Sequence, residues 1–497
     1  MAIRPLVRPV RISQNDRVTT RRLHPAWLVA AVAFVALIGA AGFRATPSVM
    51  LQPLHDEFGW SLGTISAAVS VNLLLYGLTA PFAAALMEKF GMRRVVAAAL
   101  LLVSVGSGLT VFMRSSWQLI LLWGGLVGLG TGSMALGFVA IVASRWFVHR
   151  RGLVTGVLTA GGATGQLIFL PLLARLTGAE GWRTAALVVA SAALAVVPLV
   201  WWRLRDRPSD LGVTAYGAGP DDVASLPATA LSATALAGSP PPATALAGSP
   251  PPATALAGSP PSAAPVSAAP GGAARNALSS LARAARTRPF WLLAGGFAIC
   301  GATTNGLVGT HFIPAAHDHG MAPTTAASLL ALIGLFDIAG TIASGWLTDR
   351  VDSRLLLGGY YLLRGLSLLV LPSLFAATAH PSMVIFILFY GLDWVATVPP
   401  TVALCREYFG TSGAVVFGWV FASHQIGAAA AASAAGLVRD RLGDYDWAWY
   451  GAGALALLAS LLSLMLLAGR RLNREGPGGP GIGLAFPAAA APAAPAS

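Results

Sequence analysis

Residues 26–52 read AWLVAAVAFVALIGAAGFRATPSVMLQ, an apolar run interrupted by a single cation, Arg44. A helix that crosses a bilayer needs roughly 20 mostly apolar residues, and the apolar core of a cleaved signal peptide is shorter than this run. We therefore expect a retained first transmembrane helix. Six arginines precede it, at positions 4, 8, 11, 17, 21 and 22.

The rest of the chain repeats this pattern. The sequence predicts an all-α membrane protein with twelve transmembrane helices arranged as two six-helix bundles. The chain is 56% hydrophobic and 10% charged, with a mean hydropathy of +0.70, whereas soluble domains carry roughly 25% charged residues. The expected helices lie near 26–52, 61–87, 95–113, 117–144, 152–175, 184–202, 290–313, 323–347, 355–372, 382–404, 414–438 and 447–468.

The cations fall into the short segments between the apolar runs, and the net charge is +13. With both termini in the cytoplasm, 25 of the 32 cations lie in cytoplasmic segments and 5 in external loops. This bias predicts a multi-pass protein of the inner membrane with both termini cytoplasmic. Because the cations form no clustered patch on a folded surface, nucleic-acid binding is excluded.

Residues 208–280 differ from the apolar runs in composition. ATALAGSPP occurs there three times in succession, starting at Ala233, Ala243 and Ala253. A Pro-, Ser- and Ala-rich segment cannot bury a core, so we expect a disordered cytoplasmic linker, and a regulatory role for it stays open. The predicted organisation is a cytoplasmic N-terminal segment (1–25), an N-terminal bundle (26–207), the linker (208–280), a C-terminal bundle (281–470) and a disordered cytoplasmic tail (471–497).

Two loops of the first half have counterparts in the second half at one common offset. Residues 88–94 (EKFGMRR) correspond to residues 349–355, which begin DRVDSR, and the offset is 261 residues. The same offset relates Arg145, followed by Trp-Phe, to Arg406, followed by Glu-Tyr-Phe. Two loop pairs with one offset indicate a duplicated six-helix unit.

These loops resemble the pattern G-x-x-x-D-R-x-G-R-R of the major facilitator superfamily, which follows helix 2 and returns after helix 8. Ala84 and Glu88 replace the glycine and the aspartate in the first copy, and Asp352 replaces the second glycine in the other. The resemblance implies a carrier that works by alternating access. It also implies a cytoplasmic gate, in which these acids pair with nearby cations and a helix N-terminus. The gate residues would be Glu88, Arg94, Arg145, Asp349 and Arg350; alternatively, they are loop charges that only set the topology.

Within the superfamily the chain is most similar to the monocarboxylate and oxalate/formate transporter group. The similarity rests on FGWS at 58–61, RWF at 145–147, RRG at 150–152 and Phe336-Asp337. In that group the aspartate is linked to substrate and proton, and an arginine often follows four residues later, where this chain has Thr341. The resemblance implies a carboxylate as substrate.

Four ionisable residues fall near the middle of expected helices: Arg44, Asp337, Arg364 and Asp393. An Arg or Asp at the bilayer centre costs roughly 2.5–3.5 kcal/mol unless it is paired or hydrated. Arg364 and Asp393 form either a structural ion pair or part of the proton pathway. We expect Arg44 and Asp337 to line the pathway, with the planar guanidinium of Arg44 binding a carboxylate and Asp337 exchanging a proton.

Further polar residues of the expected helices complete the candidate sites. The expected substrate-binding residues are Arg44, Tyr76, Asn72, Asn305 and Gln166, and the expected proton-coupling residues are Asp337, Asp393, Arg364 and His424. Pro399-Pro400 should kink its helix near Asp393, because proline removes backbone donors.

We found no phosphate-binding loop, metal-ligand cluster or nucleophile constellation in the sequence, so we expect a carrier without metal or cofactor rather than an enzyme or an ATP-driven pump. The predicted function is proton-coupled symport of a small organic anion such as a monocarboxylate. The expected partners are this small-molecule substrate, protons and the lipid bilayer, and we expect a monomer. Two alternatives stay open: an exporter of hydrophobic or cationic drugs on the same fold, and a transporter-like solute receptor.

Overall fold

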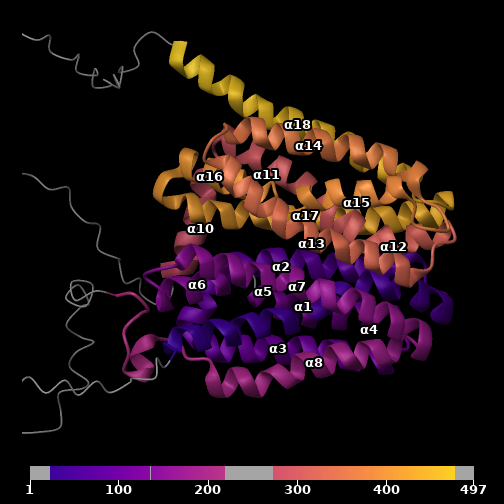
Figure 1. The fold of residues 1–497 in the computed structure, drawn as a ribbon, viewed down its shortest axis with the longest axis horizontal. Coiled ribbons are helices and arrows are strands. Elements are labelled where there is room, and N and C mark those ends of the chain that lie inside the picture. Colours follow the sequence, from indigo (N-terminus) through magenta and orange to yellow (C-terminus); the bar gives the residue numbers. More distant parts are fainter. Residues whose placement is uncertain (1–22, 135, 219–271, 476–497) are drawn as a thin grey trace, which may run out of the picture.

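The computed structural model describes residues 23–134, 136–218 and 272–475, and in these ranges every regular element is a helix. One isolated backbone bridge joins Phe147 to Tyr216. The chain forms two stacked helical bundles whose long axes run the same way (Figure 1). The expectation of an all-α membrane protein is confirmed.

The first bundle contains six crossings, the fourth of which is built from four pieces. Its elements are α1 (Pro25–Phe58), α2 (Leu62–Phe90), α3 (Met92–Leu109) with η1 (Thr110–Phe112), α4 (Ser116–Leu119) with the π-helical η2 (Ile120–Val127), α5 (Gly128–Ser133) and α6 (Leu136–Trp146), α7 (Arg151–Glu180), and α8 (Trp182–Arg203), followed by η3 (Pro208–Leu211).

The second bundle repeats this arrangement and is preceded by one extra helix, α10 (Gly272–Ala284). Its elements are α11 (Arg288–Gly301) with the π-helical η5 (Ala302–Val308) and α12 (Gly309–Asp318), α13 (Pro323–Thr348), α14 (Ser353–Val370) with η6 (Leu371–Leu374), α15 (Pro381–Asp393) with α16 (Val398–Phe409), η7 (Gly410–Ser412) with α17 (Gly413–Leu442), and α18 (Asp446–Glu475).

Eleven segments of the described chain are long and apolar enough to cross a membrane. One of them, Pro381–Leu442, is 62 residues long, whereas one crossing takes roughly 20. This segment contains α15–α16 and then α17, separated by the short turn Gly410–Ser412. Counting these as two crossings gives the six helices expected in each half.

The connections between helices are tight, and the sequence explains why. Gly59 ends α1 in the left-handed conformation, with φ of 67°, which glycine adopts without steric cost. Two residues later the Ser61 side chain accepts a hydrogen bond from the Thr64 N–H and caps α2. The turn therefore needs only three residues between the two helices.

The ends of the expected linker are ordered, which corrects the predicted boundaries. After α8 the chain folds back so that Tyr216 packs edge-on against Trp27, with ring centroids 5.6 Å apart, while α10 begins inside the range that we expected to be disordered. Both segments bury apolar side chains against the bundles, and this burial offsets the conformational entropy that ordering them costs. The ATALAGSPP repeats and the tail after Glu475 lie outside the described residues, and α18 extends beyond the expected limit of 470.

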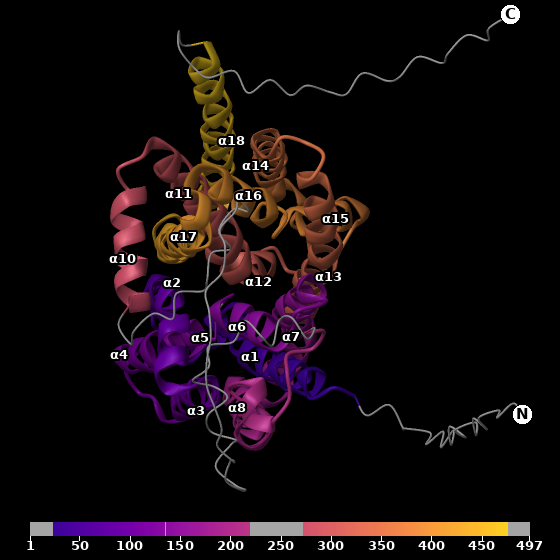
Figure 2. The same cartoon turned by 90° about the vertical axis from the view of Figure 1, so that its left-hand side faces the viewer.

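The helices define two ends of the molecule. We call the end where α1, α7, α10 and α11 begin the terminal end, and the opposite end, where α1 meets α2 and α17 meets α18, the far end. In Figure 1 the terminal end lies on the left, and Figure 2 looks onto it. The two bundles meet along α2 with α17, α7 with α13, and α1 with α12.

The internal repeat is visible in the backbone. The fourth crossing has a non-helical residue at Met134, directly after α5, and the tenth is interrupted between Asp393 and Val398. Shifting Met134 by 261 residues gives Val395, which lies inside the second interruption. The offset found in the loops therefore also relates two helix breaks. Pro399 and Pro400 lie just inside the start of α16, as expected from the missing backbone donors.

Candidate functional site

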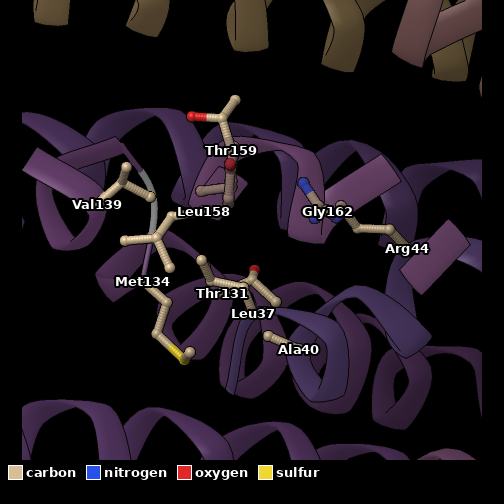
Figure 3. A pocket seen from close by; sticks show the side chains of 10 residues that line it. Leu37, Ala40, Arg44, Thr131, Met134, Val139, Leu158, Thr159 and Gly162 are labelled. Atoms are coloured by element: carbon tan, nitrogen blue, oxygen red, sulfur yellow. The ribbon is translucent and has the colours of Figure 1, made fainter. Parts of the chain in front are cut away.

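A cavity of about 110 Å³ lies inside the first bundle, close to the break in the fourth crossing. A cavity of this volume has room for several water molecules, and so for a small ligand. Figure 3 shows the side chains around it. They come from α1, α2, α5, α6 and α7 and the turn before α6, and are Leu37, Ala40, Arg44, Tyr76, Thr131, Met134, Val139, Leu158, Thr159 and Gly162.

Arg44 is the one charged residue of this lining. Its side chain is exposed within the cavity although the residue lies in the middle of α1. Among the described residues the structure gives its guanidinium neither an ion-pair partner nor a hydrogen-bond partner. The guanidinium extends along α7 over Gly162, where an added Cβ would lie 2.6 Å from Nη2. The absence of a side chain at Gly162 therefore gives Arg44 its position.

Of the other expected substrate residues, only Tyr76 lines the cavity. Its ring packs edge-on against Phe421 of α17, with centroids 5.9 Å apart, so it also joins the two bundles. Asn72 is buried and donates from Nδ2 to the Trp123 carbonyl at 2.7 Å. Because Trp123 belongs to the π-helical η2, Asn72 stabilises an irregular backbone there. Gln166 and Asn305 are half-buried and lie outside the cavity lining.

Asp337 lies in the second bundle, where its carboxylate accepts a hydrogen bond from the backbone at the break in the tenth crossing. Its Oδ1 accepts a hydrogen bond from the Val395 N–H at 3.0 Å and from the Thr341 hydroxyl at 3.1 Å. α13 can approach this break because Gly340 contacts the Leu392 carbonyl directly, leaving no room for a Cβ. Both donors to Asp337 are neutral groups, and the hydroxyl comes from the position where the related transporters often have arginine.

Arg364 and Asp393 form a buried ion pair on the other side of the same break. Arg364 Nε lies 2.6 Å from Asp393 Oδ2, and Nη2 donates to the Asp393 carbonyl at 2.7 Å. The Arg364 side chain is fully buried and also contacts Cys300 Sγ at 2.9 Å. The ion pair and Asp337 together satisfy backbone groups that the break leaves free, as a buried polar backbone requires.

His424 lies in α17 between aromatic rings, with ring centroids 4.9 Å from Phe297 and 5.9 Å from Phe421. Its Nδ1 is buried and has no hydrogen-bond partner among the described residues. The backbone of His424 touches Gly301 of α11. The residue thus lies in the packing seam between α11 and α17.

The five expected gate residues all lie at the terminal end but form no ion pair with one another in the described structure. Glu88 and Arg94 are exposed or half-exposed, and Arg350 stacks on Trp346 at 4.1 Å and donates to its carbonyl. Nearby, Gly152 and Gly156 of α7 and Gly345 of α13 have no neighbouring atoms within 4 Å of a would-be Cβ. The terminal ends of α7 and α13 are therefore open in this conformation.

The far end is joined across the two bundles by a residue that we did not predict. The carboxylate of Asp440, in α17, accepts hydrogen bonds from the Leu62 N–H at 2.9 Å and the Gly63 N–H at 2.7 Å. These N–H groups open α2, where a negative charge is stabilised by the helix dipole and by free backbone donors. Ser70 of α2 bonds the Ala429 carbonyl of α17 one layer deeper, at 2.6 Å.

Sequence reasoning could not find Asp440, because its partners lie 377 and 378 residues away. In the sequence, Asp440 is recognisable only as an acid near the end of an expected helix, at a place where the superfamily pattern requires no cation to pair with it. Glu57 and Arg183, whose charged atoms are 2.5 Å apart, lie at the same end but within one bundle.

Comparison with known proteins identifies the family. A family model described as Major Facilitator Superfamily matches residues 32–313 and 298–492. The chain is 23% identical over 426 residues to the Bacillus subtilis protein named Uncharacterized MFS-type transporter YcxA, covering 84% of this chain and 90% of the relative. It is 26% identical over 446 residues to Monocarboxylate transporter 13 of Rattus norvegicus, covering 87% of both chains. It is 34% identical over 160 residues to Monocarboxylate transporter 3 of Mus musculus, covering 32% of both.

The helical architecture, the duplicated unit and the family match agree with one another. The protein is a multi-pass membrane transporter of small molecules rather than an enzyme. The chain belongs to the Major Facilitator Superfamily.

Proposed function

We propose that this transporter carries a small organic anion such as a monocarboxylate across the inner membrane, together with a proton, by alternating access. The observation that carries the proposal is Arg44, a cation in the middle of a transmembrane helix that faces a small cavity without a counter-ion among the described residues. An unpaired arginine at this depth costs roughly 2.5–3.5 kcal/mol. A bound carboxylate would offset that cost by two parallel hydrogen bonds.

The remainder of the cavity lining fits a short anion with an apolar body. Leu37, Ala40 and Leu158 supply apolar surface, while the hydroxyls of Tyr76 and Thr159 supply donors. The relatives named as monocarboxylate transporters support a carboxylate as the anion. The lining, its charge and the relatives thus favour the same substrate class.

Asp337 is the group that we propose to carry the proton. The neighbouring cation, Arg364, is bonded to Asp393, so Asp337 can gain or lose a proton without breaking an ion pair. Its hydrogen bond from the Val395 N–H links its charge state to the broken tenth crossing. Protonation would weaken that bond, because a charged acceptor forms a stronger hydrogen bond than a neutral one.

The contacts at the two ends of the molecule support alternating access. Asp440 joins the bundles at the far end, whereas in the part of the chain that the structure describes the expected gate residues at the terminal end form no ion pair with one another. The distribution of cations assigns the terminal end to the cytoplasm. We therefore interpret this conformation as facing the cytoplasm, with Glu88, Arg94, Arg145, Asp349 and Arg350 pairing only when that side closes.

Uptake into proteoliposomes tests the proposal. A panel of labelled small carboxylates is offered under an imposed pH gradient to the wild type, Arg44→Ala and Asp337→Asn. Arg114→Ala serves as the control, because it removes an exposed cation outside the cavity. We expect one acid to accumulate in the wild type and the control, Arg44→Ala to lose uptake, and Asp337→Asn to exchange substrate without responding to the gradient.

Other outcomes identify the alternatives. Unchanged uptake in Arg44→Ala with competition by several amphipathic cations would indicate a drug exporter. Binding without counterflow in the wild type would indicate a solute receptor. Either result contradicts the proposed anion carrier.

A further inference from the structure

The helix α10 lies outside both bundles at the terminal end and touches each of them. It contacts α2 of the first bundle and α17 of the second. Figure 2 shows it at the edge of the molecule, lying across the boundary between the bundles while most other helices are seen end-on. α10 therefore runs along the plane of the membrane surface rather than through the membrane.

One face of α10 is packed against the protein. Ala277, Ser280 and Ala284 are buried, at the spacing of one helical face. The Ala277 carbonyl accepts a hydrogen bond from Trp419 Nε1 of α17 at 2.9 Å. The position of α10 is thus fixed by the bundles and does not depend on its charged residues.

The opposite face is basic and open. Arg275 and Arg283 on α10 are exposed, as is Arg286 in the turn that follows the helix, and Leu278 is 53% exposed. No ion pair joins these arginines to a carboxylate of the described chain, and from Gly272 onward the first acidic residue is Asp318, at the far end. The face presents three permanent positive charges and one apolar side chain.

Exposed tryptophans place this face at the depth of lipid headgroups. Trp291 at the start of α11 is 63% exposed and donates from Nε1 to the Ala285 carbonyl, next to α10. Trp202 of α8 and Trp346 of α13 are 67% and 57% exposed at the same end. Tryptophan gathers at the membrane–water interface, where its ring is apolar and its N–H is hydrated.

We propose that the outer face of α10 together with the turn that follows it, defined by Arg275, Leu278, Arg283 and Arg286, binds the headgroups of anionic phospholipids. Each arginine near an anionic surface is attracted to it, and an amphipathic helix lying in the interface adds burial of its apolar residue. Because α10 contacts both bundles, lipid bound there rests on the seam between α2 and α17.

Lipid binding to the full-length transporter in detergent tests this proposal without any transport substrate. Native mass spectrometry counts phosphatidylglycerol bound to the wild type and to the triple variant Arg275→Gln, Arg283→Gln, Arg286→Gln. The matched control replaces Arg203, the last residue of α8, and Arg205 and Arg207, which follow it at the same end, by glutamine. We expect the α10 variant to bind phosphatidylglycerol at least tenfold more weakly than the control variant does, and phosphatidylcholine equally.

The buried face keeps α10 in place, so the triple variant should fold; hydrogen exchange of residues 272–286 checks this. In the wild type, phosphatidylglycerol should slow exchange there, and inorganic phosphate at equal concentration should not. Equal phosphatidylglycerol binding by both variants would overturn the proposal. Protection by inorganic phosphate alone would instead indicate a site for free anions, and would also overturn it. Neither outcome depends on which solute is carried.

Discussion

Arg44 and Gly162 lie on neighbouring helices. The Arg44 guanidinium can take its position because Gly162 has no side chain. The guanidinium passes within 2.6 Å of where a Cβ would stand at Gly162. Arg44 was predictable from the sequence, because a charge inside an apolar run requires a partner or water. The role of Gly162 was not, because five glycines of the expected helix 152–175 look alike until the neighbouring helix is placed.

Gly162→Ala should displace the guanidinium and weaken anion binding by roughly tenfold, since a cation moved by about 1 Å loses paired hydrogen-bond geometry. Gly156→Ala is the matched control, because its Cβ meets no atom within 4 Å. Substrate affinity measured by counterflow distinguishes the two variants. Equal affinities would show that Gly162 does not position Arg44.

The ion pair of Arg364 with Asp393 should behave as a structural unit. Removing one partner in Arg364→Met or Asp393→Leu leaves a buried charge alone and should destabilise the protein by about 3–5 kcal/mol. The double variant should recover most of that loss, because no unpaired charge remains. Thermal unfolding in detergent measures this, and a double variant less stable than both single variants would contradict it.

At the scale of elements, the limits of the helices followed closely from the sequence. Apolar run length and the charged segments between runs determine where a helix leaves the membrane. The breaks in the fourth and tenth crossings did not follow, apart from the hint of Pro399-Pro400. Asp337 and Arg364 from other helices stabilise the break in the tenth crossing, and Asn72 stabilises the π-helical segment of the fourth crossing. Such long-range contacts leave no local pattern in the sequence.

The contact of Asp440 with the start of α2 should hold the far end closed. In Asp440→Asn the charge is lost, and with it about 1 kcal/mol of interaction with the helix N-terminus. The ratio of open to closed molecules at the far end should then rise by roughly fivefold. Spin labels at the exposed positions 56 and 441, on the two bundles, report this as a longer distance distribution.

Glu57→Gln is the control for that experiment. It removes the ion pair with Arg183, which lies at the same end but joins α1 to α8 within one bundle. Its distance distribution should match that of the wild type. A shift in this distance distribution as large as that of Asp440→Asn would show that loss of any charge at the far end opens it, and not the loss of the Asp440 contact in particular.

At the scale of the whole molecule, the duplicated unit explains most of what the sequence predicted. Two loop pairs at one offset indicated two halves, and the same offset relates the turn at Met134 to the break at 394–397. The halves have nevertheless diverged in chemistry. The first holds an unpaired cation in a cavity, and the second holds a carboxylate and an ion pair around its break. The sequence named these charges but did not divide them between two sites.

The conformation of the whole could not be predicted either. Which end is open depends on small differences between contacts at the two ends, such as the bond of Asp440 with α2 at the far end and the lack of ion pairs among the gate residues in the described structure at the terminal end. Both sets of residues are present in one sequence, because a carrier must adopt both states. A sequence therefore predicts the candidates for each gate but not the state in which the gates are found.

Equilibrium binding shows whether the cavity around Arg44 holds the anion. Purified protein in detergent is titrated with the carboxylate that the wild type accumulates, and binding is compared for wild type, Arg44→Gln and Asp337→Asn. We expect Arg44→Gln to lose measurable binding, whereas Asp337→Asn still binds, because Asp337 lies in the other bundle beside the tenth crossing. Wild-type affinity in Arg44→Gln would contradict the assignment of the site.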